Sequence, residues 1–549
     1  MCGIWAWIFH SSKLDPRMYN PDLLWETGCK SIEARGPEGC EFLDLNTGIF
    51  CFTRLAINGL NPKGMQPFQY RYLSWMCNGE IYNAKKLGEI PSGSDCEVLG
   101  QVWEESEGNP VAFCRALDGV FSLVLHDMKR RKWIIARDPC GVRPLFYTKT
   151  IEGYRFASER KALEPFCTSE WNNDEVCLIE EFPPGTVWSI DTDTLVCKEE
   201  RYHTIPWLKN PCVNTMTLRL SLESAVKKRL FTERPVAALL SGGIDSSLIA
   251  ALVQRELLAL GKPPLKTFSI GMPGSTDLYY ARKVAEWIKS DHTEVLTTAD
   301  EMFSVIPEVI RDIESYDITT VRASVGNWMV AREIKKRTDC KVVFNGDGSD
   351  EIFGSYLYFF KAPSDYAFEQ ESERLLEEIS KYDVLRSDRS ISSHGLEART
   401  PFLDKQFVSV ARSFPTDQRR PSYEKGKPEK NILRMAFGGI GLLPEEVVWR
   451  RKEAFSDGVS CEQKSWFQEI QERIENRGLV PEDWESKVDE LLGKARWLGD
   501  SPKPKTKEAY YYMELFLQNY QNTKTYWPYW MPKWSPETGD PSARTLKVE

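Results

Sequence analysis

Short apolar runs, separated by closely spaced Gly, Pro, Asn and Asp residues, dominate the chain up to about residue 200. Such runs are typical of β-strands bounded by turns. Helical spacing of apolar residues is confined to two stretches, near 20–34 and 95–116. We therefore expect stacked antiparallel sheets with one or two covering helices. The clearest predicted strands are 50–57, 72–77, 120–125 and 133–136.

Beyond a Pro-broken stretch at 203–215, apolar strands alternate with longer amphipathic helices. This alternation predicts a mainly parallel sheet, which binds ligands beyond the carboxyl ends of its strands. After about residue 363 the pattern is mostly helical and ends in a Trp- and Pro-rich tail. We therefore expect two domains, 2–205 and 206–549. The predicted strands of the second domain are 234–240, 265–270 and 341–344, and its first two predicted helices are 248–260 and 278–288.

Composition narrows the class of protein. The 549 residues are 42% hydrophobic and 28% charged, with a mean hydropathy of −0.42, as in ordinary globular proteins. A net charge of −9 predicts no nucleic-acid partner and no acidic-membrane surface. The sequence has neither an apolar run of the ~18 residues that a membrane span needs nor a signal-peptide pattern. The 14 cysteines are scattered without CxxC spacing, so we expect reduced thiols, no zinc site and a cytoplasmic location.

The first residues, MCGIWAWIFH, place a cysteine directly after the initiator Met1. If Met1 is removed, the Cys2 thiol and a free α-amino group share one residue. The amine titrates near ~7.7–8.0 and the thiol near ~8.5, so the amine can act as a built-in base for the thiol. Cys2 is thus a candidate nucleophile. Taken alone, however, Cys2 is better explained as a small apolar residue that begins a buried strand, and the rest of the chain must decide.

A second candidate site is the stretch LSGGIDSS at 240–247, which joins a predicted strand to a predicted helix. Two glycines let the backbone turn tightly and bring N–H groups towards an anion. A following Asp or Ser can cap the helix, whose N-terminus favours phosphate. A plain strand-to-helix turn is the alternative. No Walker lysine follows the glycines, so this is not the usual kinase-type loop. It resembles the pyrophosphate loop of enzymes that split ATP between its α and β phosphates.

Several further motifs occur in a fixed order along the whole chain. With Cys2 and SGGIDSS they give a chain that resembles the glutamine-dependent asparagine synthetases. The motifs are RGP at 35–37, RLAI at 54–57, NGEIYN at 78–83, SDCEV at 94–98, GVRPLFY at 141–147, FASE at 156–159, FPPG at 182–185, TFSIGM at 267–272, ARKVA at 281–285, GSDE at 348–351, GLEART and PFLD at 395–404, and WRRKEAFSDG at 449–458.

This resemblance implies a fold and a reaction for each domain. The first domain would be an N-terminal-nucleophile sandwich of α/β/β/α type that hydrolyses glutamine. The second would be a mainly parallel-sheet adenylating domain with a helical C-terminal part. Aspartate would be activated by ATP and Mg²⁺ as β-aspartyl-AMP, and ammonia would arrive from the first site through a largely apolar tunnel. Glutamine, aspartate and ATP are the implied small-molecule partners, and a homodimer is an assembly that the resemblance allows.

The resemblance also assigns residues to the glutaminase site. Cys2 would form a γ-glutamyl thioester, and Asn78 with Gly79 would stabilise the tetrahedral oxyanion. Arg54 would bind the substrate carboxylate as a planar fork. Glu80 and Asp95 would bind the substrate ammonium. The remaining residues implied to bind glutamine are Leu55, Ala56, Ile57 and Asn58.

In the second site the resemblance implies two sets of residues. Asp347 and Lys452 are the implied catalytic residues, and Asp245 and Asp350 the implied Mg²⁺ ligands, in keeping with the preference of Mg²⁺ for carboxylate and phosphate oxygens. Arg399 and Asp404 are expected on the aspartate side. The residues implied to bind ATP are Leu240, Ser241, Gly242, Gly243, Asp245, Ser246, Ile270, Asn345 and Gly346.

Four positions depart from the family pattern. Ala34 and Thr53 stand where His is usual, Glu38 where Asp is usual, and Asp347 where Glu is usual. These departures keep two alternatives open. One is a degenerate paralogue that binds a nucleotide or a partner without catalysis, and the other is a β-lactam-synthetase-like adenylating enzyme, against which the presence of Cys2 speaks.

Overall fold

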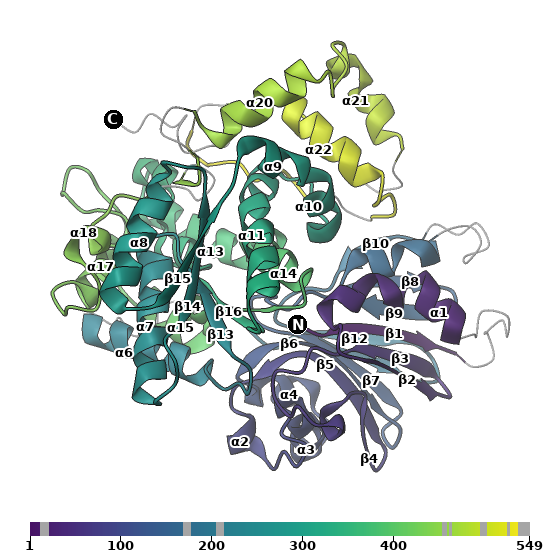
Figure 1. The fold of residues 1–549 in the computed structure, drawn as a ribbon. Helices are drawn as coiled ribbons and strands as arrows, with labels where there is room; N and C mark the ends of the chain where they lie inside the picture. The colour runs from purple at the N-terminus through teal and green to yellow at the C-terminus, as the bar shows by residue number, and fades with distance from the viewer. Residues whose placement is uncertain are drawn as a thin grey trace.

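The computed structural model describes residues 1–10, 21–167, 177–204, 214–452, 458–460, 464–494, 502–523 and 527–535. We call residues 1–204 the N-terminal half and residues 214–535 the C-terminal half. Two antiparallel sheets form the first and one parallel sheet forms the second (Figure 1). The domain boundary predicted at 205/206 lies outside the described residues and stays a prediction.

The N-terminal half is a sandwich of two six-stranded sheets. In spatial order, the first sheet contains β10 (Ile179–Glu181), β8 (Phe146–Thr150), β9 (Gly153–Ala157), β1 (Gly3–Phe9), β3 (Gly48–Thr53) and β2 (Cys40–Leu45). The second contains β12 (Cys197–Arg201), β11 (Thr186–Asp191), β7 (Lys132–Arg137), β6 (Gly119–Asp127), β5 (Leu73–Ile81) and β4 (Phe68–Tyr70).

Alternating side chains of these strands fill the space between the sheets and the space outside them. Ile4 and Ala6 of β1 face the second sheet, whereas Trp5 and Trp7 face outward into a separate core. Short helices cover the two outer faces: α1 (Pro21–Thr27) and the 3₁₀ helix Cys29–Arg35 on one side, and α2 (Ala84–Leu87), α3 (Leu99–Glu105) and α4 (Pro110–Ala116) on the other. The α/β/β/α sandwich predicted for this half is confirmed.

One predicted strand is too long. The apolar pattern predicted a strand at 50–57, but β3 ends at Thr53 and the following residues form a loop. Leu55 and Ile57 are buried, as the pattern required, but in a core shared with helices of the C-terminal half. Burial of Leu55 and Ile57 against the C-terminal half therefore produced an apolar pattern like that of a longer strand.

The C-terminal half is built on a five-stranded sheet in which every neighbouring pair is parallel. Its spatial order is β15 (Asp291–Leu296), β14 (Lys266–Gly271), β13 (Val236–Leu239), β16 (Val342–Phe344) and β17 (Glu397–Arg399). The chain runs outward from β13 to β15 and then resumes on the other side of β13 with β16. This reversal creates a crevice at the carboxyl ends of β13 and β16, where open parallel sheets bind ligands.

Helices cover both faces of this sheet. Within β13, Ala237 packs into one core and Ala238 into the other, as the alternation of side chains in a strand requires. The helices are α6 (Thr215–Lys228), α7 (Ile244–Ala259), α8 (Thr276–Ile288), α9 (Ala299–Ser304), α10 (Ile306–Ile313), α11 (Ile318–Arg337), α12 (Ser349–Phe353), α13 (Asp365–Glu377), α14 (Asp383–Ser392), α15 (Lys405–Arg412), α16 (Thr416–Arg419), α17 (Asn431–Phe437), α18 (Glu445–Val448), α20 (Trp466–Asn476), α21 (Trp484–Leu492) and α22 (Lys507–Leu517).

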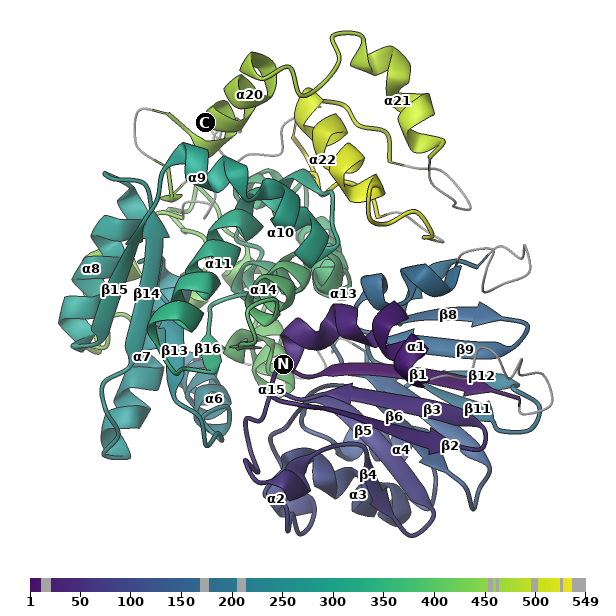
Figure 2. The ribbon, with the colours of Figure 1, turned by 45° about the vertical axis from the view of Figure 1, so that its right-hand side comes forward.

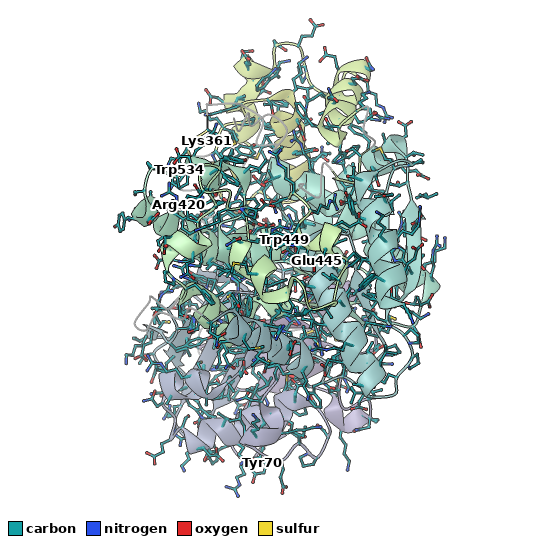
Figure 3. The ribbon with its side chains drawn as sticks, turned by 90° about the vertical axis from the view of Figure 1, so that its left-hand side faces the viewer. Tyr70, Lys361, Arg420, Glu445, Trp449 and Trp534 are labelled. Atoms are coloured by element: carbon teal, nitrogen blue, oxygen red, sulfur yellow. The ribbon has the colours of Figure 1, made fainter. Side chains whose placement is uncertain are left out.

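The Trp- and Pro-rich tail returns to the body of the C-terminal half. The Trp530 backbone N–H donates to Asp317 (2.7 Å), and the Tyr382 hydroxyl donates to the Pro528 carbonyl (2.8 Å). In Figure 3, Trp534 lies beside Lys361 and Arg420, far from Tyr70 at the foot of the N-terminal half and apart from Glu445 and Trp449 on the same face. The tail is therefore packed against the helices that surround the parallel sheet.

The two halves meet around the N-terminus, which lies between them in both ribbon views (Figure 2). Buried ion pairs cross this junction. Arg35 contacts Asp388 (2.9 Å), Arg143 lies 3.6 Å from Glu397, and Arg399 contacts Glu80 (3.1 Å). Near Cys2 the contacts between the halves thus include charged pairs as well as the apolar core around Leu55 and Ile57, and the largely apolar tunnel that the resemblance implies stays a prediction.

Candidate active sites

Cys2 lies at the start of β1, with its sulfur against a neighbouring loop. The Leu55 N–H donates to the Cys2 sulfur (3.4 Å), and the thiol lies 3.5 Å from the Leu55 carbonyl. Arg35 holds the Cys2 backbone by donating from Nε to its carbonyl (3.0 Å). Burial raises the pKa of the thiol to about 11. With Met1 in place, the thiol is therefore protonated at neutral pH.

Met1 fills the space between the two halves. Its side chain is buried, and its α-amino group donates to the Leu396 carbonyl (3.1 Å). Burial lowers the pKa of this amine to about 5, so it is neutral at pH 7. In this form the amine belongs to Met1 and not to Cys2. The built-in base expected at Cys2 exists only after Met1 has been removed.

Asn78 and Gly79, on β5, have the features expected of an oxyanion site. The Asn78 side chain is fully buried, and within the described residues neither its nitrogen nor its oxygen has a hydrogen-bond partner. A buried amide without partners is costly, which indicates a ligand that supplies them. At Gly79 a Cβ atom would lie 2.2 Å from the Val120 carbonyl oxygen, so only glycine fits there.

Asn58 bridges the two carboxylates that were predicted to bind an ammonium group. Its side-chain nitrogen donates to Glu80 (3.0 Å) and to Asp95 (3.5 Å). Burial raises the pKa of Asp95 to about 6. Burial and the nearby Asp95 charge raise the pKa of Glu80 well above its ordinary value, although Arg399 opposes this. A cationic ligand bound beside these two buried carboxyl groups would favour their ionised form.

Arg54 does not present its fork entirely to a ligand. Its Nη1 donates to the Asn61 carbonyl (3.0 Å) and its Nη2 to the Gly59 carbonyl (2.5 Å). These bonds fold residues 54–61 around the guanidinium group. In this conformation part of the fork shapes the loop, and binding of the substrate carboxylate by Arg54 stays a prediction.

The residues that follow Arg54 contribute mainly backbone groups. Leu55 and Ile57 point into the core shared with the C-terminal half, and their side chains are 2% and 4% exposed. The Ala56 N–H donates to Glu38 (2.9 Å). Of the predicted glutamine-binding residues in this loop, Leu55 touches the Cys2 sulfur, and Asn58 reaches Glu80 and Asp95.

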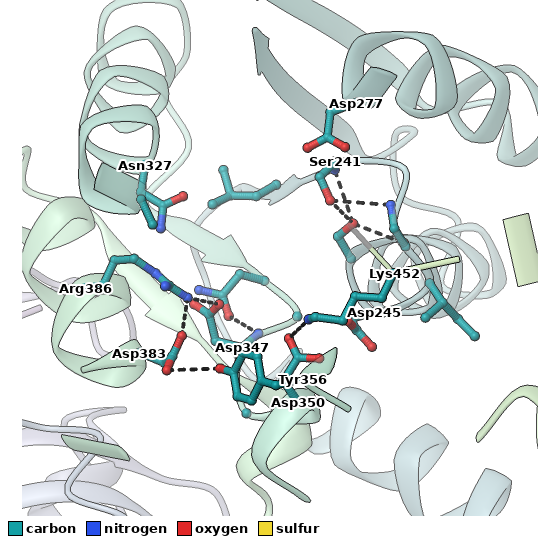
Figure 4. A pocket seen from close by; sticks show the side chains of 18 of the residues that line it. Ser241, Asp245, Asp277, Asn327, Asp347, Asp350, Tyr356, Asp383, Arg386 and Lys452 are labelled. Atoms are coloured by element: carbon teal, nitrogen blue, oxygen red, sulfur yellow. Dashed lines mark hydrogen bonds and ion pairs between the residues drawn. The ribbon is translucent and has the colours of Figure 1, made fainter. Parts of the chain in front are cut away.

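A cavity of about 430 Å³ lies at the carboxyl ends of β13, β14 and β16 (Figure 4). It brings together residues from loops far apart in the sequence. Every residue predicted to bind ATP lines it except Gly242. The predicted residues that do line it are Leu240, Ser241, Gly243, Asp245, Ser246, Ile270, Asn345, Gly346, Asp347, Asp350 and Lys452.

The loop between β13 and α7 is held by its own serines. The Ser246 hydroxyl accepts from the Ser241 N–H (3.1 Å), and the two hydroxyls lie 3.0 Å apart. Gly242 adopts a φ of +73° and faces Tyr280 rather than the cavity, which is why it is absent from the lining. The first turn of α7 therefore opens on the cavity, as a phosphate site at a helix N-terminus requires.

Two lysines neutralise the predicted metal carboxylates. Lys430 forms ion pairs with Asp245 and with Asp350 (2.6 Å), and Lys452 pairs with the second oxygen of Asp350. Burial would raise the pKa of Asp350, but these lysines lower it below its ordinary value. Lys430 could not be predicted from the sequence, because its contact with Asp245 joins residues more than 180 positions apart in the chain.

Asp347 lies at the cavity wall beside Arg386, whereas Lys452 reaches Asp350 (Figure 4). It accepts a hydrogen bond from Arg386 (3.3 Å), which also pairs with Asp383 (2.7 Å). Burial raises the pKa of Asp347, and the Arg386 charge works against that rise. Asp347 is thus a half-buried carboxyl group at the cavity wall with one guanidinium partner, a setting that suits a group that exchanges a proton.

Arg322 is a cavity residue that sequence reasoning missed. It lies on α11 and forms a two-pronged ion pair with Glu508 of α22 (2.8 and 2.6 Å). Its guanidinium group also stacks on Phe467 of α20 (4.6 Å). The signal that could have pointed to Arg322 is a run of polar residues at the start of this helix, Thr319, Thr320 and Arg322. The C-terminal helices thus position a cation at the cavity.

Arg399 and Asp404, expected on the aspartate side, lie elsewhere. Neither is among the residues that line the cavity. Arg399 reaches into the N-terminal half, where it contacts Glu80. Asp404 caps α15 through the Gln406 N–H (3.1 Å) and pairs with Arg229 (2.7 Å). Both expectations are wrong, because these side chains join segments of the chain to one another.

Comparisons with known proteins agree with this division. The family model described as "Glutamine amidotransferase domain" matches residues 1–197, and that described as "Asparagine synthase" matches residues 217–371 and 362–534. Proteins named "Asparagine synthetase [glutamine-hydrolyzing]" from Bos taurus and Homo sapiens are each 40% identical to this chain. The alignments span 587 and 588 residues and cover 100% of this chain and 98% of each relative. The Gallus gallus protein of the same name is also 40% identical, with 99% of its length covered. The chain therefore belongs to the family of glutamine-hydrolysing asparagine synthetases.

Proposed function

We propose that this protein makes asparagine from aspartate, with ATP as the energy source and the amide of glutamine as the nitrogen source. The products are asparagine, glutamate, AMP and pyrophosphate. The observation that carries the proposal is one chain with two separate sites: a half-buried Cys2 thiol in the N-terminal half and a phosphate-loop cavity in the C-terminal half. Membership of the family supports the same reaction.

In the first site, the Cys2 sulfur attacks the amide carbon of glutamine. The α-amino group that removal of Met1 leaves on Cys2 takes the thiol proton and passes it to the departing ammonia. Water then hydrolyses the γ-glutamyl thioester to glutamate. The free side-chain nitrogen of Asn78 and the Gly79 N–H supply donors for the oxyanion. Glu80 and Asp95 bind the substrate ammonium group, and the Arg54 guanidinium attracts its carboxylate.

In the second site, a carboxylate oxygen of aspartate attacks the α-phosphorus of ATP and pyrophosphate leaves. The loop at Ser241–Ser246 binds the departing phosphates, and Lys430, Lys452 and Arg322 supply positive charge around them. Ammonia then attacks the acyl carbon, and AMP leaves. Asp347 takes the proton that the attacking nitrogen must lose, since its half-buried carboxyl group lies at the cavity wall.

Mg²⁺ fits this cavity as a companion of ATP. Asp245 and Asp350 offer oxygen atoms at the cavity wall, and the described residues hold no group of three or more His, Cys, Asp or Glu side chains placed to bind a metal. Mg²⁺ is usually bound by one or two carboxylates together with substrate phosphates and water. Bound in this way, it would neutralise phosphate charge. Lys430 and Lys452 balance the two carboxylates in this structure.

Location and assembly are further parts of the proposal. Every cysteine in the described ranges is a free thiol, which supports a reducing, cytoplasmic location. None of the helices in those ranges has the length and apolar character needed to cross a membrane. A homodimer stays a prediction.

The reaction class is tested with ammonium in place of glutamine, so that only the second site is needed. Aspartate, ammonium and MgATP should give asparagine, AMP and pyrophosphate in equal amounts. The Cys2→Ala variant should do the same and should form no asparagine from glutamine. Release of ADP and phosphate, or no reaction with aspartate, would refute the proposed function and would favour a binding protein or another adenylating enzyme.

A further inference from the structure

The loop that touches the Cys2 sulfur is held from the other half of the molecule. We define this loop as residues 54–59. Leu55 contacts the sulfur through its backbone, and the next residue, Ala56, has both of its backbone groups engaged by charged side chains. Its N–H donates to Glu38 (2.9 Å), and its carbonyl accepts from Nε of Arg234 (2.7 Å).

Arg234 closes a ring around Ala56. Its Nη2 contacts both carboxylate oxygens of Glu38 (3.0 and 2.9 Å) while its Nε binds the Ala56 carbonyl. Both side chains are about a quarter exposed, at 27% and 26%, so the ion pair alone is of modest strength. Its importance lies in geometry, because two planar groups fix both sides of one peptide unit.

Glu233 fixes the far end of the loop. Gly59 turns the chain with a φ of +61°, and its N–H donates to the Glu233 side chain (2.6 Å). The Glu233 N–H in turn donates to the Ile57 carbonyl (3.1 Å). Two consecutive residues of the C-terminal half thus bind the loop at Ala56, Ile57 and Gly59.

The segment that carries these two residues is itself anchored. Arg399 donates to the Arg229 carbonyl and to the Phe231 carbonyl (2.9 Å) while also contacting Glu80. Beyond Arg234 the chain enters β13, which leads to the phosphate loop. Positions 233 and 234 therefore have little freedom to follow the 54–59 loop, and the loop must conform to them.

We propose that Arg234 and Glu233 are positioning residues of the glutaminase site, which hold the 54–59 loop, and through Leu55 the Cys2 thiol, in the reactive arrangement. The inference rests on the proposed function and adds that the first site is complete only when the second half is docked on it. Misplacement of a reacting group by ~1 Å can cost on the order of 10²-fold in rate. Loss of the Arg234 contacts is expected to lower kcat/KM for glutamine about 10- to 100-fold.

The test compares Arg234→Ala with Arg282→Ala. Arg282 is a matched control, since it forms a two-pronged pair with Glu294 (2.8 and 2.9 Å) in the same half but away from the loop. Each variant is assayed for glutamine hydrolysis and for asparagine formation from ammonium. Arg234→Ala should lose glutaminase efficiency, through kcat as well as KM, and keep the ammonium-driven rate. Arg282→Ala should match the parent in both assays. Equal losses in both assays, or parental glutaminase kinetics, would overturn the inference.

A second pair of variants covers the case in which Arg234→Ala folds poorly. Glu233 is exposed, so Glu233→Ala should fold, and it removes the acceptor for the Gly59 N–H. Glu233→Gln keeps an acceptor oxygen and should restore most of the lost glutaminase efficiency. A purely electrostatic role of Glu233 would predict equal losses in the two variants and would contradict positioning.

A third measurement does not depend on the proposed function. Alkylation of Cys2 by iodoacetamide, followed on the N-terminal peptide, reports how the loop covers the thiol. Both Arg234→Ala and Glu233→Ala should change this rate relative to the parent, and Arg282→Ala should not. If the alkylation rates agree in all variants, the loop is not held by these residues, whatever reaction the protein catalyses.

Discussion

At the scale of single residues, Met1 decides whether Cys2 can act. With Met1 retained, burial holds the pKa of the thiol at about 11 and that of the Met1 amine at about 5. A thiol with a raised pKa stays protonated until the pH approaches that value, so thiolate is scarce at pH 8. Removal of Met1 places the free α-amino group on Cys2 and takes away a buried side chain from the junction of the two halves.

The two N-terminal forms should therefore differ in thiol reactivity. In the Met1-retaining form, alkylation of Cys2 by iodoacetamide should be slow at pH 8 and should rise about tenfold per pH unit towards pH 11, because only the thiolate reacts. The processed form should react faster at pH 8. Mass spectrometry of the N-terminal peptide measures both forms in one sample. Equal rates at pH 8 would show that Met1 does not suppress the nucleophile.

Asp347 carries the second residue-scale prediction. Its carboxyl group is the proposed proton acceptor for the attacking ammonia, so Asp347→Asn should reduce asparagine formation on the order of 10²-fold or more from either nitrogen source. Glutaminase activity should persist, since Cys2 lies in the other half. Because burial raises the pKa of Asp347, the ammonium-driven rate should also fall as the pH falls through that raised value. If Asp347→Asn makes asparagine at the parental rate, Asp347 is only a structural partner of Arg386 and is not the proton acceptor.

Some departures from the family pattern are explained by contacts in the structure, and others are not. Glu38 reaches both the Ala56 N–H and Arg234, and these contacts use its full length. The Thr53 hydroxyl donates to the Ile32 carbonyl (3.3 Å), a contact within the N-terminal half. Nothing in the structure explains Ala34. None of these roles could be predicted from the sequence, because each depends on a segment brought close only by folding.

At the scale of elements, the predicted succession of a strand, a loop with glycines and a helix located the phosphate loop correctly. The pattern works here because β13, the loop at 240–243 and α7 follow one another directly in the chain. It could not say that Gly242 faces away from the cavity. It also extended the strand at 50–57 too far, since the burial of Leu55 and Ile57 comes from the C-terminal half.

Gly242→Ala should disturb the phosphate loop specifically. A Cβ atom there would lie 2.4 Å from Cβ of Tyr280, at a φ of +73° that disfavours any side chain. We expect the KM for ATP to rise about 10- to 100-fold as the loop shifts by a fraction of an ångström. Glutaminase activity should stay at the parental level.

Gly274→Ala is the control for this variant. Gly274 has a similar φ of +83°, but nothing lies within 4 Å of a Cβ atom built on it. It shares the backbone strain, of order 1–3 kcal/mol, without the collision. If both variants raise the KM for ATP alike, strain rather than displacement of the loop is responsible.

At the scale of the whole molecule, contacts between segments that are distant in the chain complete each site. Arg399 of the parallel sheet contacts Glu80 beside the glutaminase site, and Glu508 of the last helix orients Arg322 at the cavity. The sequence predicted both halves and the loops at 240–246 and 345–350 that line the cavity, because those residues lie in contiguous motifs. It missed Arg322, Lys430 and Arg386, whose approach depends on packing between distant helices and loops.

The central claim is that one chain moves nitrogen from glutamine to aspartate at the expense of ATP. The most direct test is to supply glutamine labelled with ¹⁵N at the amide, together with aspartate and MgATP, and to analyse the asparagine formed. The label should appear in the asparagine amide, with one AMP, one pyrophosphate and one glutamate for each asparagine, and Cys2→Ala should abolish its transfer. Unlabelled asparagine, or ADP and phosphate in place of AMP and pyrophosphate, would contradict the account.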